Sequence, residues 1–235
     1  MKRTIALLAA LLAGASAPLV AQSSSYSVTM DFPYVSKYVF RGTQIAKSSF
    51  QPSVEATVGD FYAGIWVNSP IVNPHDATGA AKKEIDLYAG YNLKVSDTLK
   101  ADVGLTYYYY PQANKHLARE YTYEGSFGLN WTLGGFTPST YAYYDFKLKA
   151  WTFQGSLGYS VPLKDIGTSL DLNGTIGTVQ TDGGDDYSYY SVGVTVPFKL
   201  SETAKFNLGV TYTTNNLAGA KDPGLWFTAG LTVGF

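Results

Sequence analysis

The chain has 235 residues, a formal net charge of −1, no cysteine, 24 glycines, 20 tyrosines and 12 phenylalanines. The lack of cysteine excludes a disulfide framework and thiolate chemistry, and the near-neutral charge argues against nucleic acid as a partner. Only 15% of the residues are charged, which together with the many aromatic residues is typical of a protein with one apolar and one polar side.

The first residues predict a secretory signal peptide over residues 1–21. A basic start, residues 1–3, is followed by an apolar run over 5–12 and then by small residues. Pro18 stands directly after the small-x-small motif of residues 15–17, so we expect cleavage after Ala21 and a mature chain that begins at Gln22. The apolar run is too short to span a bilayer. We therefore expect residues 22–235 to form a single domain without a transmembrane helix.

From about residue 25 onward the dominant period is two, the side-chain period of a β-strand. Within residues 84–95, for example, Ile85 and Leu87 alternate with Glu84 and Asp86. One face of each such segment is apolar and the other carries charge, and each segment reaches the ~9–11 residues that a tilted spanning strand needs. This pattern predicts twelve strands, at residues 26–40, 49–58, 60–69, 83–95, 98–111, 119–133, 136–147, 150–161, 167–180, 187–199, 204–215 and 224–235.

The links between these strands alternate in length. Those at 59–60, 96–97, 134–135, 162–166 and 200–203 are tight, whereas those at 43–48, 70–82, 112–118, 181–186 and 216–223 are longer and polar. Only the link at 147–149 is short where a long one is expected. Short turns at one end and long loops at the other are typical of an outer-membrane barrel with both termini in the periplasm. The fold class that we predict is all-β, a transmembrane antiparallel up-and-down β-barrel.

A soluble antiparallel sandwich also alternates, but it turns its apolar face inward. Here aromatic residues gather near the ends of the apolar stripes, where an interfacial girdle of a membrane barrel lies. Backbone groups in hydrocarbon must all be paired, and closure of the sheet removes its unpaired edges. The pattern therefore favours the barrel.

The last strand ends on an aromatic residue. Leu231, Val233 and Phe235 are apolar at every second position, which resembles the C-terminal assembly signal of outer-membrane barrels. Together with the export signal, this predicts location in the bacterial outer membrane. The expected partners are outer-membrane lipid and the barrel assembly machinery.

Residues 26–124 carry an ordered series of motifs that resembles the TorF family of proteobacterial outer-membrane β-barrels. The resemblance implies an outer-membrane location and a pore, and it says little about the solute, because the function of that family is itself inferred. The motifs are Tyr38-Val39-Phe40-Arg41-Gly42, Gln51-Pro52-Ser53-Val54, Phe61-Tyr62-Ala63-Gly64-Ile65-Trp66, Glu84-Ile85-Asp86-Leu87-Tyr88-Ala89-Gly90-Tyr91 and Asp102-Val103-Gly104-Leu105-Thr106-Tyr107 to Pro111.

Alternation also predicts which charged residues face the lumen. In the outer half they form a net acidic group, and in the periplasmic half a net basic one. One interpretation is a constriction that selects small polar solutes by size and dipole. The other is a plug in which Arg41 pairs with Glu84 and Asp86 and no transport occurs. The predicted outer cluster is Arg41, Glu84, Asp86, Glu124, Asp145 and Lys147.

Catalysis and cofactors are not expected. The only histidines, His75 and His116, fall in predicted surface loops, and neither a nucleophile-elbow pattern nor metal-ligand spacing is present. The acidic stretch Asp182 to Asp186 fails the spacing of a calcium loop and is interpreted as a solvated turn. We therefore predict no enzyme activity, no metal and no cofactor.

These observations predict a porin-like channel for passive diffusion of small polar solutes. A closed scaffolding barrel without transport is the alternative. The mixed charge of the lumen argues against a dedicated channel for acidic sugars, which would need a clear basic excess. The identity of the solute and the oligomeric state stay open at this point.

Overall fold

The computed structural model describes residues 26–72, 83–113 and 119–235. The predicted signal peptide, His75 and His116 lie outside the described residues. Within this part of the chain the fold is all-β, with one short 3-10 helix, η2 (Lys164–Ile166). No helix there has the length and apolar character that crossing a membrane requires.

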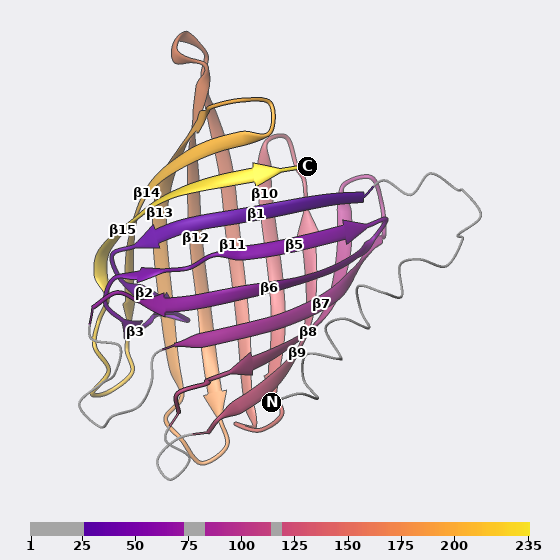
Figure 1. Cartoon of the computed structure of the whole chain (residues 1–235). Coiled ribbons are helices and arrows are strands. Elements are labelled where there is room, and N and C mark those ends of the chain that lie inside the picture. The colour runs from indigo at the N-terminus through magenta and orange to yellow at the C-terminus, as the bar shows by residue number, and fades with distance from the viewer. Residues whose placement is uncertain (1–25, 73–82, 114–118) are drawn as a thin grey trace, which may run out of the picture.

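Twelve antiparallel strands close into a barrel (Figure 1). Each strand pairs with its neighbours in the sequence, which is an up-and-down order, and β4 and β5 share one position in the wall, between β1 and β6. The wall strands are β1 (Tyr26–Val35), β4 (Ser49–Phe50), β5 (Ser53–Val58), β6 (Phe61–Pro70), β7 (Glu84–Lys94), β8 (Leu99–Tyr109), β9 (Tyr121–Trp131), β10 (Phe136–Asp145), β11 (Ala150–Leu163), β12 (Thr168–Thr181), β13 (Tyr187–Lys199), β14 (Ala204–Asn215) and β15 (Gly224–Gly234).

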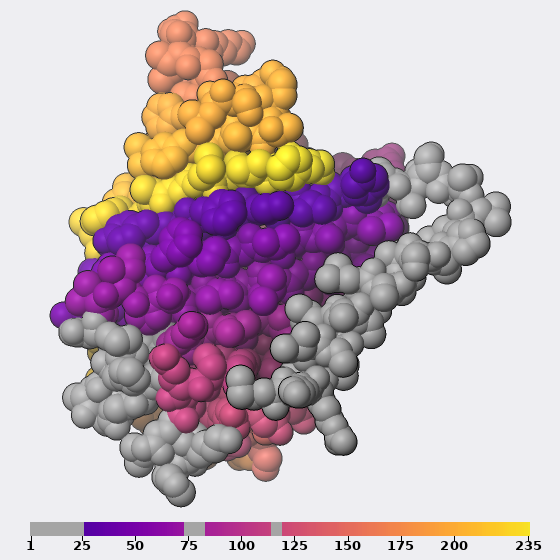
Figure 2. Space-filling model, viewed as in Figure 1, coloured from indigo at the N-terminus to yellow at the C-terminus, as the bar shows by residue number. Residues whose placement is uncertain are grey.

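The barrel closes where β15 pairs with β1. Their register runs from Thr29 opposite Gly234 to Val35 opposite Thr228. Beyond the last paired residues, the Phe235 N–H donates to the Val28 carbonyl over 2.9 Å, and the Val28 N–H donates back over 3.0 Å. Figure 2 shows the side chains of β15 and β1 side by side in one continuous wall. The sheet therefore has no open edge, as a sheet surrounded by lipid requires.

Short turns and longer connections lie at opposite ends of the barrel, which we call the turn end and the loop end. Gly134 and Gly135 form the turn between β9 and β10 with φ values of 56° and 91°. A two-residue turn of this kind needs positive φ at both positions, and glycine adopts it without a steric penalty. Residues Tyr26 and Phe235 lie at the turn end, where β1 begins and β15 ends.

The apolar stripe faces outward and the polar stripe faces the lumen. On β8, Val103 and Leu105 are each 56% exposed on the outer surface. Asp102, the residue before Val103, faces inward and is only 5% exposed. This arrangement is the reverse of a soluble sandwich, which buries its apolar face between two sheets. The alternation predicted from the sequence is thus confirmed, and the outer surface needs an apolar environment.

Aromatic rings form a belt on the outer surface at the loop end. The Tyr107 ring contacts the rings of Tyr109 and Tyr121, with centroids 6.5 and 5.5 Å apart. Farther around the barrel, the Phe146 ring contacts the rings of Tyr123 and Tyr144. The Trp151 ring continues the belt, with contacts to Tyr144 and Phe153. Such a belt matches the depth at which amphipathic rings favour a membrane interface.

The main departure from the predicted strands concerns residues 26–40. The wall strand β1 ends at Val35, and residues beyond it form a separate hairpin, β2 (Tyr38–Phe40) and β3 (Thr43–Ala46). The chain leaves the wall because Lys37 binds the carbonyls of Pro223 and Leu225 across the β1–β15 seam. Alternation continues through both parts, so the single strand 26–40 and the outer loop 43–48 were wrong predictions.

The two faces predict different responses to a new charge. Ile176, 66% exposed on the outer surface, and its lumen-facing neighbour Thr175 on β12 form a matched pair. Ile176→Lys should lower the free energy of unfolding by about 2–4 kcal/mol. Thr175→Lys should cost under about 1 kcal/mol, because one hydroxyl contact is lost. Urea titration of the vesicle-inserted protein measures both, and equal costs would contradict the assigned faces.

Candidate functional site

The β2–β3 hairpin folds into the lumen at the loop end. Its turn consists of Arg41 and Gly42, with φ values of 46° and 80°, and Phe40 pairs with Thr43 on either side of it. Positive φ in a residue other than glycine is strained, and such strain persists where the surroundings hold the residue in place. Arg41 is held by the contacts of its side chain.

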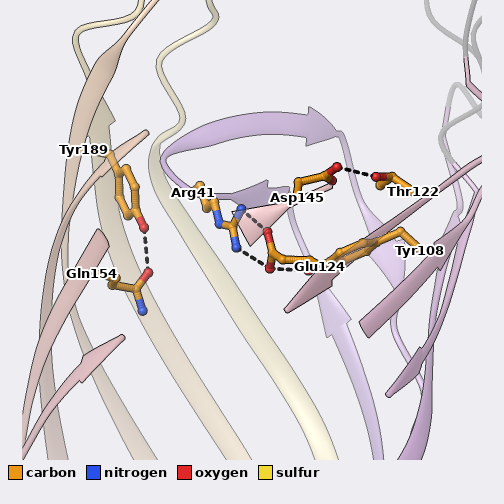
Figure 3. Close-up of polar contacts among 7 residues, drawn as sticks. All are labelled: Arg41, Tyr108, Thr122, Glu124, Asp145, Gln154 and Tyr189. Atoms are coloured by element: carbon orange, nitrogen blue, oxygen red, sulfur yellow. Dashed lines mark hydrogen bonds and ion pairs between the residues drawn. The ribbon is translucent and has the colours of Figure 1, made fainter. Parts of the chain in front are cut away.

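Arg41 forms a two-pronged ion pair with Glu124 on β9 (Figure 3). Its two terminal nitrogens donate to the two carboxylate oxygens over 2.8 and 2.7 Å, and the side chains are only 13% and 4% exposed. The guanidinium also lies 4.7 Å from the ring centres of Phe40 and Tyr143. Burial alone would lower the pKa of Arg41, but the hydrogen bonds and charge of Glu124 outweigh it and raise the pKa. Arg41 is therefore a fixed cation.

Tyr38 fastens the start of the hairpin to the same side of the barrel. Its hydroxyl donates to Glu84 on β7 over 2.8 Å, and its ring lies 5.4 Å from that of Trp66 on β6. Tyr110 donates to the second oxygen of Glu84 over 3.1 Å. Burial and the nearby Glu84 carboxylate raise the pKa of Tyr38, so this phenol stays a neutral donor.

The turn of the hairpin also contacts the opposite wall. The side-chain amide of Asn215 on β14 donates to the Gly42 carbonyl over 2.7 Å. A side chain at position 42 would overlap Tyr189 on β13, so this approach requires glycine. The hairpin therefore reaches across the lumen, from β6, β7 and β9 to β13 and β14.

The remaining acidic residues of the predicted cluster line the loop end around this hairpin. Asp86 faces the lumen beside Trp66 and Tyr108 in the strand register, and its buried Oδ1 has no hydrogen-bond partner among the described residues. Asp145 accepts from Thr122 over 2.5 Å and from the backbone at the start of the β10–β11 turn. Asp145 thus caps a turn, while Asp86 stays available to the lumen.

Two of the sequence predictions about charge need correction. Arg41 lies in the lumen, but it comes from a hairpin turn and pairs with Glu124, not with Glu84 and Asp86. Lys147 does not join the cluster, since its ammonium lies 3.2 Å from the centre of the Tyr121 ring, which belongs to the outer surface. The β10–β11 turn reverses the chain one residue after Asp145, so alternation does not extend to Lys147.

The basic residues predicted for the turn-end half lie at its rim. Lys94 pairs with Asp97 over 2.7 Å and Lys199 with Glu202 over 2.6 Å, both in exposed turns. Lys100 and Lys205 are also exposed. The interior below the hairpin therefore holds the carboxylates of Asp31, Glu55 and Asp102, while these lysines surround the mouth.

The lumen contains open space on both sides of the hairpin. At the loop end, a cavity of about 250 Å³ lies next to Arg41, Glu124 and Asp145. At the turn end, a wider cavity of about 780 Å³ is lined mainly by Ser, Thr, Pro and Lys side chains of β11–β15 and β1. Between them a third cavity, of about 270 Å³, lies against β1, β5, β6, β14 and β15.

Tyrosine rings line the lumen without filling it. Tyr88 lies directly opposite Gly64 in the β6–β7 ladder, and Tyr141 lies opposite Gly128 in the β9–β10 ladder. A Cβ atom on either glycine would overlap the facing ring, so each ring lies flat where a side chain is missing. The same wall thus presents aromatic faces to the lumen.

A metal site is not supported within the described residues. No group of His, Asp and Glu side chains there could hold a metal ion. In the stretch 182–186, Asp182 lies 3.5 Å from Lys149 and Asp186 accepts from the Thr181 N–H. These contacts are those of a loop turn.

Sequence reasoning missed Tyr38, Gly42 and Asn215 as parts of the site. The signal that could have located the hairpin is the dipeptide Arg41-Gly42 between two alternating segments, since glycine in a two-residue link is typical of a tight hairpin. Tyr38 and Asn215 carry no such signal. Their role depends on a contact between segments far apart in the chain.

Comparisons with known proteins support the fold and the family. A family model described as "Bacterial protein of unknown function (Gcw_chp)" matches residues 20–220. None of the curated proteins matches this sequence.

Among solved structures, the chain resembles one titled "KdgM porin", with 11% identity, a TM-score of 0.59 and coverage of 88% of this chain and 99% of the other. It also resembles "KdgM porin in complex with disordered oligogalacturonate", with 9% identity, a TM-score of 0.57 and coverage of 89% and 99%. A structure of the NanC porin follows, with 9% identity, a TM-score of 0.54 and coverage of 88% and 98%. At these identities the likeness concerns the fold.

The Arg41–Glu124 pair is expected to carry much of the stability of the hairpin. Arg41→Ala leaves Glu124 buried without its cation, which should lower the free energy of unfolding by about 3–5 kcal/mol. The double variant Arg41→Ala, Glu124→Gln should recover part of this loss, because it removes the stranded charge. Urea titration measures both effects.

The exposed pair of Lys94 and Asp97 gives the control for that experiment. Lys94→Ala should cost under about 1 kcal/mol, since both partners are solvated. If Arg41→Ala cost no more than Lys94→Ala, the hairpin would not depend on the buried pair.

Proposed function

The chain belongs to the Gcw_chp family of bacterial proteins of unknown function, and we propose that it is a porin-like channel of the outer membrane through which small polar solutes diffuse passively. The observation that carries the proposal is a polar lumen with cavities at both ends and a third one halfway along it. The apolar outer surface fits a lipid environment. The resemblance of the fold to structures titled porins is consistent with it.

The topological details of the proposal follow from the sequence. We take the turn end as periplasmic and the loop end as extracellular, because outer-membrane barrels have short periplasmic turns. Residues 1–21 would then act as the export signal, and Leu231, Val233 and Phe235 as the signal for the barrel assembly machinery. The resemblance to the TorF family of outer-membrane barrels belongs to the same proposal. No enzymatic step is part of it.

In this channel the hairpin acts as the constriction. It crosses the loop end of the lumen and carries one fixed cation, Arg41, toward Glu124, with Glu84 and Asp86 nearby. Opposite charges on facing parts of a pore produce a transverse field, which favours solutes that are small and dipolar. Asp145 would contribute to the same field from the turn that it caps.

A closed scaffolding barrel is the second candidate, and a specific observation favours it. The hairpin is bonded to both sides of the barrel, through Glu84 and Glu124 on one side and Asn215 on the other. Contacts of this kind on both walls are also what a permanent plug would need. The cavity next to Arg41 and Glu124 is the feature that favours the channel.

Conductance separates the two candidates. In planar bilayers, the full mature chain should give discrete open steps. Arg41→Ala should raise the single-channel conductance roughly twofold or more, because it frees the turn of the hairpin and removes a charge from the constriction. Lys94→Ala, at the rim, serves as the control and should leave the conductance unchanged.

A silent bilayer would support the scaffold, provided that the protein migrates as a folded, heat-modifiable barrel. If Arg41→Ala left the current unchanged but lowered the free energy of unfolding, the hairpin would be a structural element outside the path of the ions. Either result overturns the proposed role of the hairpin.

The charge of the lumen predicts a preference for cations. Arg41 is already paired with Glu124, and the basic residues at the periplasmic mouth are exposed or paired with turn carboxylates. The carboxylates that remain toward the lumen attract cations and repel anions. They include Asp31, Glu55, Asp102 and Asp171.

We therefore expect a reversal potential of cationic sign in a potassium chloride gradient, with K⁺ favoured over Cl⁻ by roughly threefold or more. Glu55→Gln should reduce this ratio, because it removes a carboxylate from the lumen face of β5. Asp97→Asn, in an exposed turn, is the matched control and should change it little. An anion-selective current would contradict this account of the lumen.

A further inference from the structure

We propose that the cavity halfway along the lumen binds an uncharged sugar ring, so that the solute class of the channel is neutral saccharides. The inference rests on the proposed function for its transport aspect, but binding itself can be tested without transport. The cavity has a volume of about 270 Å³ and lies on the periplasmic side of the hairpin. That volume is below the range for drug-sized ligands and suits a single small ring.

Trp66 supplies the aromatic surface of this cavity. It projects from β6 into the lumen, and its ring is held by the ring of Tyr38 at 5.4 Å. An indole ring fixed in this way presents a broad apolar surface at little cost in conformational entropy. A sugar ring has one face of C–H groups that packs against such a surface, while its hydroxyls remain free to form hydrogen bonds.

Polar side chains surround the ring in positions that suit hydroxyl groups. Asn207 donates to Thr232 over 2.9 Å, and Thr232 donates to Oδ1 of Asp31 over 2.5 Å. This chain of bonds fixes the Asp31 carboxylate at the cavity wall, and its Oδ2 can accept from a solute hydroxyl. Gln51 is oriented in the same way by its bond to Asn68, 3.0 Å long. Side chains ordered in advance lose little entropy when a solute binds.

The aromatic lining continues beyond the cavity. Tyr88 and Tyr62 lie on β7 and β6, next to Trp66 along the wall, with their ring centres 6.3 Å apart. Both rings lie over glycines of the facing strand, and the Tyr62 hydroxyl donates to Asp102 over 3.3 Å. A sugar leaving the cavity toward the periplasm therefore meets further flat rings with a carboxylate beside them.

Charge and hydrogen-bonding groups select the class of sugar. Asp31 is the one charged side chain among the described residues that line the cavity, so an acidic sugar would bring two carboxylates together at a cost. A simple organic cation would satisfy Asp31 but would offer no acceptor to the second amide N–H of Asn207 and of Gln51, the first being used within the wall. A neutral sugar has both donors and acceptors and satisfies all three.

Binding is tested first in detergent, where conduction is not required. Tryptophan fluorescence of the full mature chain should change in a saturable way with glucose and maltose. It should respond at least tenfold more weakly to glucuronate and to choline, the acidic and cationic probes. Equal or stronger binding of glucuronate or choline would overturn the inference.

Two tryptophans of the lumen provide a matched pair of variants. Trp66→Phe should abolish the fluorescence change, and Trp66→Ala should weaken sugar binding at least tenfold in calorimetry. Trp226, also in the lumen but outside this cavity, binds Thr213, and Trp226→Ala should leave binding unchanged. Asp31→Asn keeps the shape of the site and should weaken binding severalfold without unfolding the barrel. Equal effects of the Trp66 and Trp226 changes would overturn the assignment.

Current block then connects the site to transport. Glucose or maltose should reduce the single-channel current of the wild-type protein, and Trp66→Ala should raise the half-blocking concentration at least tenfold. If the barrel bound sugar saturably but carried no current, the binding site would be supported and the proposed channel would be overturned. If the protein conducted ions but bound no sugar in detergent, the channel would be supported and the sugar site would be overturned.

Discussion

Closure of the sheet between β15 and β1 is the constraint on which the rest of this structure depends. A backbone amide in hydrocarbon has no water to bond, so an open edge would leave a row of unpaired groups. The pairing of β15 with β1, extended to Phe235 and Val28, removes that edge. Once the sheet is closed, alternation leaves each side chain either in the apolar surroundings or in the lumen, and the polar stripe becomes the lining of the lumen.

The closed wall also explains how a strained turn can persist inside the barrel. Arg41 has a positive φ, which its own backbone disfavours. The wall supplies Glu124 at the distance of a two-pronged ion pair and Asn215 as a donor to the neighbouring carbonyl. Both partners belong to strands that the closure holds in place, so the hairpin is positioned by the barrel and not by its own propensity.

The sequence allowed the barrel, its twelve strands and its two faces to be predicted, because the period of two repeats in every strand and is decided locally. It did not allow the end of β1 to be found. Residues 38–40 alternate as well as those before them, and the departure at Val35 depends on Lys37 binding carbonyls near position 225. Arg41 was placed in the lumen, but its partner could not be identified, since Glu84, Asp86 and Glu124 are equivalent until the hairpin is positioned in space.

The hairpin does not divide the lumen symmetrically, and this bears on how a plug and a channel can share one structure. Its ion pair and phenol contacts lie on the side of β6 to β9, while the cavity on its turn-end side lies against β1, β5, β6, β14 and β15. The tyrosine rings that line the wall lie flat over glycines, so they do not fill this cavity. A hairpin bonded to Glu84, Glu124 and Asn215 can therefore be rigid while the cavity on its turn-end side stays open. The Arg41–Glu124 pair then sets the width of the constriction at the loop end, and releasing the hairpin from this pair should widen it.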